Sequence, residues 1–283
     1  MPIDVLVSVL MTCYNREKYI AQAIESVLFS SYQNFELIIV DDCSSDNTIA
    51  IANKHAEKDS RIRVYVNAEN LGDYPNRNKA ASLAKGKYIK YVDSDDYIYP
   101  NGLEIMVNAM EQFPKAGFGL CSLKPDTAKP FPFILNPKEA YEYHFFGPGL
   151  FHKGPLTAIF LKDAFESMGG FKEERMISDT DMWHRMALQW PVVLMQDGIV
   201  WQRRHGDQEL NEQHKYIVDA AKIKWNYLLD SQCPLSNLQL LQIKKKRIKR
   251  YTGFILSGIK KLNFKQVTTY LKCLVQTFKI RIS

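Results

Sequence analysis

Residues 1–120 alternate short runs of β-branched and other apolar residues with amphipathic segments of helical spacing. This alternation is typical of β-α-β units, and it predicts a largely parallel sheet with helices packed on its faces. The predicted helices cover 19–28, the segment from Ser44 to about Lys58, and 76–84. The predicted strands are Val5 to Met11, Phe35 to Val40, Arg61 to Val66, Tyr88 to Val92 and Gly117 to Leu123.

The rest of the chain is expected to be irregular at first and then mainly helical. Residues 124–155 are rich in proline and aromatic residues, which predicts loops lying over the sheet. A strand is expected at 157–161, helices at 162–168 and 180–189, and further helices from 215 onward. A length of 283 residues allows a domain of about 200 residues with an appendage. We therefore divide the chain into a domain at 1–215 and a helical basic extension at 216–283.

The cysteines and the apolar runs indicate in which cellular compartment the protein is expected. Five cysteines are scattered without a C-x-x-C pair, which favours neither a disulfide framework nor a zinc site and fits a reducing cytoplasm. The first residues lack the basic flank and the cleavage site of a secretory signal. No window approaches 18 uncharged apolar residues, so we expect no membrane-spanning helix.

Charge is distributed unevenly along the chain. There are 37 Lys and Arg residues against 31 Asp and Glu, yet 12 basic residues and no acidic residue follow Asp230. The tail contains the basic run 244–250, and apolar residues then recur at helical spacing from Val267 to Ile282, which predicts a basic amphipathic helix. Two alternatives stay open: the helix contacts an anionic membrane surface at the cytoplasmic side, or it packs on the main domain or on a second subunit.

Two of the predicted strands end directly in acidic residues. Asp41-Asp42 follows one, and Asp93-Ser94-Asp95-Asp96 follows another. Ligands of open parallel sheets bind beyond the carboxyl ends of the strands, so these five carboxylates are expected to converge on one crevice. Because like charges repel, a divalent cation such as Mg²⁺ or Mn²⁺ is the simplest compensator, and it suits a nucleoside-diphosphate ligand. The alternative is that these aspartates only cap helices.

The order of several motifs resembles that of family 2 glycosyltransferases, which have the GT-A fold. The resemblance extends over about residues 3–205 and implies a Rossmann-like, mostly parallel central sheet flanked by helices. It implies a metal-dependent inverting glycosyltransferase. It rests on 7–16 (VSVLMTCYNR), 35–48 (FELIIVDDCSSDNT), 70–72 (NLG), 77–78 (RN), 84–89 (AKGKYI) and 93–96 (DSDD) as the D-x-D region.

The resemblance assigns roles to individual residues of this chain. Asp95 and His205 are implied as metal ligands for Mn²⁺ or Mg²⁺, and Asp96 is an alternative because Asp-Ser-Asp-Asp permits two registers. Asp42 is implied to accept a hydrogen bond from the base or ribose. The implied contacts to the nucleotide sugar are Thr12, Tyr14, Asn15, Asp42, Arg77, Asp93 and Arg204.

An inverting transfer also needs a base that deprotonates the acceptor hydroxyl. The segment 178–185 (SDTDMWHR) resembles the part of the family that supplies this base, and it follows Gly169-Gly170-Phe171 as in the family. The resemblance implies Asp179 as the catalytic base. Because Ser178 stands where the family often has Glu, Asp181 is kept as the alternative.

The predicted reaction moves a sugar from a nucleotide-diphosphate sugar, a UDP-sugar by resemblance, to a glycan or lipid-linked acceptor in surface polysaccharide biosynthesis. A sugar nucleotidyltransferase is disfavoured because the turn at 11–16 has no glycine, and a serine hydrolase because no G-x-S-x-G occurs. The non-enzymatic alternative is a nucleotide-sugar or membrane-surface binding protein. Nucleic acid is not expected as a partner, and the sequence is compatible with both a monomer and a homodimer.

Overall fold

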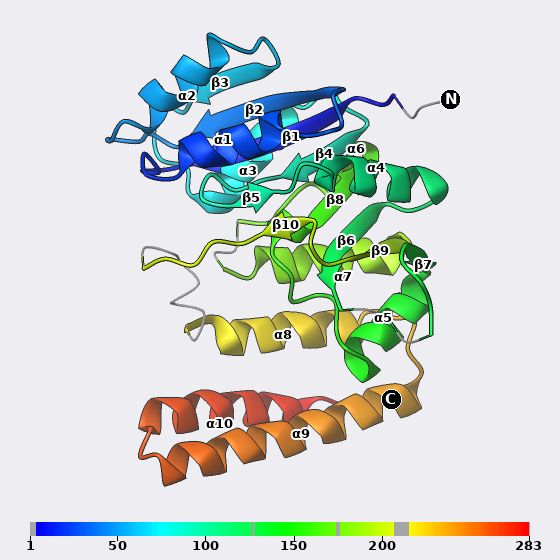
Figure 1. The fold of residues 1–283 in the computed structure, drawn as a ribbon. Helices are drawn as coiled ribbons and strands as arrows, with labels where there is room; N and C mark the ends of the chain where they lie inside the picture. The colour runs from blue at the N-terminus through cyan, green and yellow to red at the C-terminus, as the bar shows by residue number, and fades with distance from the viewer. Residues whose placement is uncertain (1–3, 125, 127, 174–175, 207–214, 283) are drawn as a thin grey trace.

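A computed structural model of the protein describes residues 4–124, 126, 128–173, 176–206 and 215–282. In these residues an eight-stranded sheet forms the centre of the molecule (Figure 1). Strands β3, β2, β1 and β4 run parallel, β8 is antiparallel to both β4 and β6, β9 is parallel to β6, and β7 closes the edge in the antiparallel sense. The order is β3 (Ile62–Val66), β2 (Phe35–Asp41), β1 (Val7–Cys13), β4 (Tyr88–Tyr91), β8 (Ala158–Leu161), β6 (Phe118–Leu123), β9 (Val192–Gln196) and β7 (Phe133–Leu135). The predicted mostly parallel sheet is confirmed.

Two apolar clusters cover the two faces of this sheet. Alternate residues of β1 enter different clusters, since Val9 and Met11 pack on one face and Leu10 on the other. A strand buried on both faces needs a nearly continuous apolar run, which is what β1 and β2 provide. One face is covered by α1 (Ile20–Leu28), α2 (Thr48–Ala56) and α4 (Gly102–Gln112), and the other by α3 (Asp73–Ser82), α6 (Lys162–Ser167) and α7 (Ser178–Gln189).

The expectation of loops throughout 124–155 is wrong for part of that segment. Residues Phe133–Leu135 form the edge strand β7, and Pro137–Phe146 form helix α5. The side chain of Asn136 accepts a hydrogen bond from the Glu139 N–H at 3.0 Å, and the Glu139 carboxylate accepts one from the Asn136 N–H at 2.9 Å. This capping box, with Pro137 at the first helical position, starts the helix despite the surrounding prolines.

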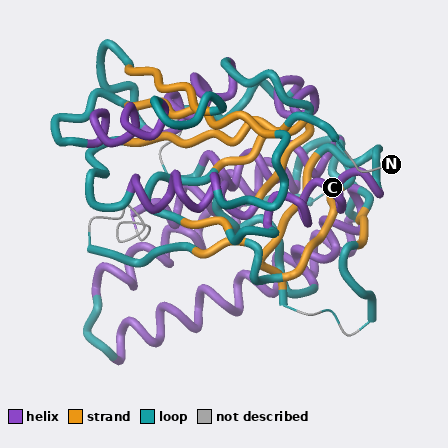
Figure 2. The backbone as a smooth tube through the Cα atoms, turned by 45° about the horizontal axis from the view of Figure 1, so that its top comes forward, coloured by secondary structure: helices purple, strands orange, loops and turns teal. Residues whose placement is uncertain are grey.

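The C-terminal residues are helical, as predicted. They form α8 (Ile217–Leu228), α9 (Asn237–Lys260) and α10 (Phe264–Lys279). Figures 1 and 2 both place the α9–α10 hairpin on the side of the molecule away from β1, β2 and β3. Trp225 and Leu228 of α8 and Ile243 of α9 belong to one of the two core clusters on the sheet. The boundary at 215/216 stays a prediction. None of the described helices is both long enough and apolar enough to span a bilayer.

Candidate active site

A pocket of about 270 Å³ opens at the carboxyl ends of β1, β2 and β4. Four of the five carboxylates expected to converge line it, namely those of Asp42, Asp93, Asp95 and Asp96. Asp41 does not line it, because its side chain accepts hydrogen bonds from the Ser44 N–H at 2.8 Å and the Cys13 thiol at 3.4 Å. Of the predicted site residues, the pocket is lined by Thr12, Tyr14, Asp42, Arg77, Asp93, Asp95 and Asp179.

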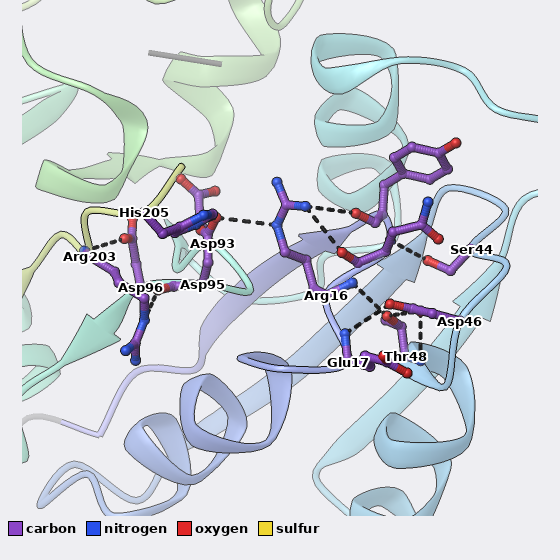
Figure 3. A network of polar contacts seen from close by, with 12 residues as sticks. Arg16, Glu17, Ser44, Asp46, Thr48, Asp93, Asp95, Asp96, Arg203 and His205 are labelled. Carbon is purple, nitrogen blue, oxygen red and sulfur yellow. Dashed lines mark hydrogen bonds and ion pairs between the residues drawn. The ribbon is translucent and has the colours of Figure 1, made fainter. Parts of the chain in front are cut away.

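The turn after β1 is tied to the loop after β2. Asn15 has a φ of +52°. Its N–H donates to the Ser44 hydroxyl at 2.8 Å, and its side-chain oxygen accepts from the Ser45 N–H at 2.9 Å. The Arg16 N–H donates to the Thr48 hydroxyl at 2.7 Å (Figure 3). The polar residues at 44–48 therefore hold the turn at 14–17 in place. Asn15 is exposed and does not line the pocket.

Asp42 is almost fully buried at the end of β2. Its carboxylate accepts hydrogen bonds from the N–H groups of Leu71 and Gly72 at 2.8 and 2.9 Å, and from the Asn67 side chain at 2.8 Å. Gly72 has a φ of +86°, a conformation that favours glycine. Asp42 thus fixes the 70–72 turn. A carboxylate has about four lone-pair sites, so it retains accepting capacity toward the pocket.

Arg77 lies between two carboxylates in the floor of the pocket. Its guanidinium forms ion pairs with Asp93 at 2.6 Å and with Asp73 at 2.8 Å, and it lies over the ring of Tyr91. Burial alone would lower the pKa of Arg77, but the carboxylates of Asp73 and Asp93 raise it well above its ordinary value. Arg77 therefore keeps its positive charge despite being buried.

Asp95 is the centre of a second polar cluster. The same carboxylate oxygen lies 3.0 Å from His205 Nε2 and 3.2 Å from Arg16 Nε. Figure 3 shows these three side chains pointing toward one another. The imidazole of His205 stacks on Tyr19, with ring centroids 4.6 Å apart. Antiparallel pairing of β5 (Tyr97–Ile98) with β10 (Val200–Trp201) carries the late 201–205 segment to this position.

The neighbouring Asp96 is held by the same late segment. The Arg203 N–H donates to the Asp96 carboxylate at 2.9 Å, and the Arg203 guanidinium donates to the Asp95 carbonyl oxygen at 2.9 Å. Burial, followed by the charges of Asp93 and Asp95, raises the pKa of Asp96. Arg204, the predicted phosphate contact, is exposed and does not line the pocket.

The side chains of Asp95 and His205 are suited to a divalent cation that takes few ligands from the protein. Carboxylate and imidazole groups are ligands of Mn²⁺, and the two converging atoms of Asp95 and His205 are 3.0 Å apart. Across the part of the chain that the structure describes, no group of three or more His, Cys, Asp or Glu side chains is arranged to hold a metal. Mg²⁺ and Mn²⁺ commonly take one or two protein ligands and complete their shell with phosphate oxygens and water.

The two candidate bases lie in different environments. Asp179, in the first turn of α7, lines the pocket, and its carboxylate accepts a hydrogen bond from the Thr180 N–H at 2.5 Å. Burial raises the pKa of Asp179 to about 6. Asp181 is 2% exposed and forms ion pairs with Lys172 at 2.8 Å and Arg185 at 2.6 Å. Its contacts are those of a side chain that braces the helix.

Comparison with known proteins identifies the family and the fold of the chain. Residues 8–169 match the sequence model of glycosyl transferase family 2, which is more than half of the chain. The chain belongs to this family.

Solved structures of glycosyltransferases have a fold similar to that of this chain. S. aureus TarS 1–349, described in complex with UDP-GlcNAc, superposes with a TM-score of 0.69 at 21% identity over 96% of this chain and 81% of TarS 1–349. The mannosyltransferase PcManGT of Pyrobaculum calidifontis, described with GDP-Man and Mn²⁺, gives a TM-score of 0.65 at 15% identity over 96% of this chain and 87% of that one.

Sequence relatives of this glycosyltransferase include proteins of glycan synthesis. EpsE of Bacillus subtilis, provisionally named a glycosyltransferase, is 29% identical over 243 residues, which cover 82% of this chain and 84% of EpsE. WfgD of Escherichia coli is named a UDP-Glc:alpha-D-GlcNAc-diphosphoundecaprenol beta-1,3-glucosyltransferase. It is 41% identical over 107 residues, which cover 38% of this chain and 42% of WfgD. The match to WfgD therefore spans less than half of either protein.

Sequence reasoning missed two residues that line this pocket. Asp73 lines the pocket and pairs with Arg77 four residues later on α3, a spacing that places two side chains on one helical face. That spacing was visible in the sequence. Arg16 pairs with Asp95, which is 79 positions away, and no local signal links two such residues.

Proposed function

We propose that this glycosyltransferase is inverting and moves a sugar from a UDP-sugar to a hydroxyl group of a glycan or lipid-linked acceptor in surface polysaccharide synthesis. The observation that carries the proposal is that one pocket joins a buried cation, Arg77, a group of strand-end carboxylates and a separate carboxylate with a raised pKa, Asp179. These are the groups that binding of a diphosphate and removal of an acceptor proton require.

The donor is proposed to lie along the ends of β1, β2 and β4. Thr12, Tyr14 and Asp42 would contact the base and ribose, and Asp93 would contact the ribose. Tyr14 is 47% exposed at the pocket, which leaves its ring available for stacking on a base. Arg77 would contact the diphosphate. The proposal of a UDP-sugar is supported by the UDP-linked donors that the names of TarS 1–349 and WfgD carry. Asn15 and Arg204 stay predicted nucleotide contacts.

Asp95 and His205 would hold Mn²⁺ or Mg²⁺. The ion would stabilise negative charge on the departing diphosphate. Arg16 lines the pocket and pairs with Asp95, so its guanidinium would be available to a phosphate oxygen once a cation shares that carboxylate.

Asp179 is proposed as the base. A base works best when its pKa lies near the working pH, because it is then ionised and still accepts a proton readily. With a pKa of about 6, the carboxylate of Asp179 is mostly ionised at neutral pH. The hydroxyl proton of the acceptor would pass to Asp179 as the oxygen attacks the anomeric carbon from the face opposite the diphosphate.

We further propose that the tail contacts the cytoplasmic face of a membrane. One side of α10 packs inward, since Cys273 and Thr277 are buried. The other side leaves Leu271, Val275 and Phe278 about half exposed. Exposed apolar side chains on a basic helical hairpin suit an anionic lipid surface. A homodimer through the same side stays a prediction.

The experiment that tests the catalytic proposal is isothermal titration with UDP, GDP and dTDP, each with and without Mn²⁺. We expect UDP to bind with metal dependence, and Asp95→Ala to remove that dependence. Asp163→Ala is the matched control, because Asp163 is exposed on α6 and outside the pocket. No binding by any nucleotide under any condition would overturn the proposal.

Transfer is tested separately from binding. Slow hydrolysis of UDP-glucose without acceptor, followed by proton NMR, should release the β-anomer first from the α-linked donor. Release of the α-anomer would contradict inversion. Binding of UDP-sugars with neither hydrolysis nor transfer would favour the alternative function of a binding protein.

A further inference from the structure

A second cavity, of about 550 Å³, lies among α5, α8 and α9, outside the donor pocket. Four basic side chains line it: Lys224 from α8, and Lys246, Arg247 and Arg250 from α9. The tail run of basic residues, which the donor chemistry leaves unexplained, therefore contributes three of its side chains to one concave site.

No carboxylate lines this cavity among the residues that the structure describes. The acidic residues of α5 and α8 lie outside its lining, and α9 and α10 contain none. The basic groups instead contact neutral partners. Lys246 donates to the Phe145 carbonyl oxygen at 3.2 Å, and Arg247 donates to the Tyr251 hydroxyl at 3.2 Å.

The closely spaced basic groups of the cavity repel one another. Burial, together with the charges of Arg247 and Arg250, lowers the pKa of Lys224 to about 8. The charge of Asp179 offsets part of this shift. Lys246 and Arg250 are exposed to solvent, so the repulsion acts mainly at Lys224 and Arg247, and an anion that enters the cavity would reduce it. Arginine in particular forms paired hydrogen bonds to phosphate oxygens.

The basic cavity adjoins a second cavity with a mixed lining. A neighbouring cavity of about 340 Å³ lies at the α9–α10 hairpin. It shares Ile217, Phe254 and Tyr270 with the basic cavity. These three side chains form an apolar border where the cavities meet, and Asn263, Lys265, Gln266 and Thr269 line the rest of the second cavity. A basic site with an apolar border is complementary to an amphiphile with an anionic head and a hydrocarbon chain.

One loop connects the basic cavity to the donor pocket. Gly147 and His152 line the basic cavity, and residues 154–156 line the donor pocket. The loop is anchored on both sides: His144 accepts hydrogen bonds from the backbone N–H groups at 150 and 151, and the Trp183 indole donates to the Lys153 carbonyl oxygen at 2.6 Å. The loop that borders the basic cavity therefore continues into the lining of the donor pocket, which also includes Asp179.

We propose that the basic cavity binds the phosphate or diphosphate of a lipid-linked acceptor, whose hydrocarbon chain leaves past Ile217, Phe254 and Tyr270. This inference rests on the proposed transferase function, since it specifies how the acceptor is held. The acceptor sugar would then extend along the 147–156 loop toward the donor pocket.

The test is isothermal titration of the full chain with farnesyl diphosphate in the presence of EDTA, so that no metal can hold the probe at Asp95. Lys224→Met and Arg250→Gln should each weaken binding by about tenfold or more, because each removes one charged partner of the phosphate. Lys249→Gln is the matched control: Lys249 is an exposed residue of the same helix that does not line the cavity, and its loss should leave the affinity unchanged.

Two comparison ligands identify the source of the affinity. Farnesol, which lacks the phosphates, and inorganic diphosphate, which lacks the hydrocarbon, should both bind more weakly than farnesyl diphosphate. Equal binding of either one overturns the amphiphile assignment. So does unchanged affinity in both cavity variants, or tighter, variant-sensitive binding of a DNA duplex. If Lys224→Met does not fold, as judged by circular dichroism, Arg250→Gln at an exposed position still decides the question.

Failure of this inference is distinguishable from failure of the proposed function. A parallel titration of the wild-type chain with UDP and Mn²⁺ reports on the donor pocket alone. If UDP binds and farnesyl diphosphate does not, only the acceptor site is refuted. If farnesyl diphosphate binds with the expected variant sensitivity and UDP does not, the anion site stands and the transferase proposal fails.

Discussion

Replacing Asp179 with Asn should abolish transfer while leaving the donor bound. The change removes the charge and the basicity but keeps an oxygen that can accept the Thr180 N–H, so the first turn of α7 should persist. Loss of a general base typically costs about 10² to 10⁴ in rate. Affinity for UDP, measured by titration with Mn²⁺, should change by less than about threefold, because Asp179 is proposed to contact the acceptor rather than the nucleotide.

The pKa of Asp179 also predicts how the activity of the wild-type protein changes with pH. The base acts in its ionised form, so activity is present above its pKa and is lost as the pH falls through about 6. For one group with that pKa, about nine-tenths is ionised at pH 7 and about one-tenth at pH 5. The initial rate of sugar transfer at low substrate concentration should therefore fall about tenfold between these two values.

Stability should change in the opposite direction to activity. A carboxyl whose pKa is raised on folding, here from 3.8 to about 6, makes the folded state less stable as the pH rises through that window. A pKa difference of about two between the folded and unfolded states corresponds to about 3 kcal/mol in the free energy of unfolding. Solvent in the open pocket reduces this contribution to about 1 kcal/mol. Asp179→Asn should thus be more stable than wild type at pH 7 and equal to it below pH 4 in urea unfolding. A variant that keeps more than a tenth of wild-type activity, or one that loses UDP binding, would refute the reasoning.

Three further substitutions separate structural from catalytic roles. Asp181→Asn should lower the free energy of unfolding by about 3 kcal/mol, because it breaks a buried ion-pair cluster. The transfer rate at 20 °C should stay within about threefold of wild type. A hundredfold loss of rate would instead identify Asp181 as the base. Arg77→Gln should cost about 2 kcal/mol in urea unfolding and weaken UDP binding about tenfold, and unchanged UDP affinity would remove Arg77 from the donor site. Gly86→Ala should cost about 2 to 4 kcal/mol, because the added Cβ would lie 2.6 Å from the backbone nitrogen of Ser8 in β1; a melting temperature equal to wild type would contradict this.

The half of the fold that could be predicted depends on local patterns. The apolar runs of β1, β2 and β4 are nearly continuous, and the acids that follow β2 and β4 mark where these strands end. Parallel pairing then brings the ends together, so four predicted carboxylates share one pocket without any knowledge of side-chain geometry. The convergence of acidic side chains at strand ends can therefore be predicted from sequence in this type of sheet.

The remainder depends on contacts between distant segments. Strand β8 inserts antiparallel between β4 and β6, which nothing in its four residues specifies. The pairing of Arg16 with Asp95 likewise follows only from the finished sheet. Helix α5 is a different case, since the Asn136-Pro137 start with Glu139 two residues later is a local signal that the abundance of proline obscured.

The residues proposed to bind the donor and those on the acceptor side come from different segments of the chain. The ends of β2 and β4 bring Asp42 and the Asp93–Asp96 carboxylates to the pocket, and α3 adds Arg77; all of them come from the first hundred residues. Residues 154–156 and Asp179 also line the pocket, and their positions depend on the later strands and on α7. Because these two sets of residues lie on separate segments of chain, the acceptor side can vary without disturbing the groups proposed to bind the donor. Residues 147–156, which border both cavities, are therefore where a change of acceptor would have to be accommodated.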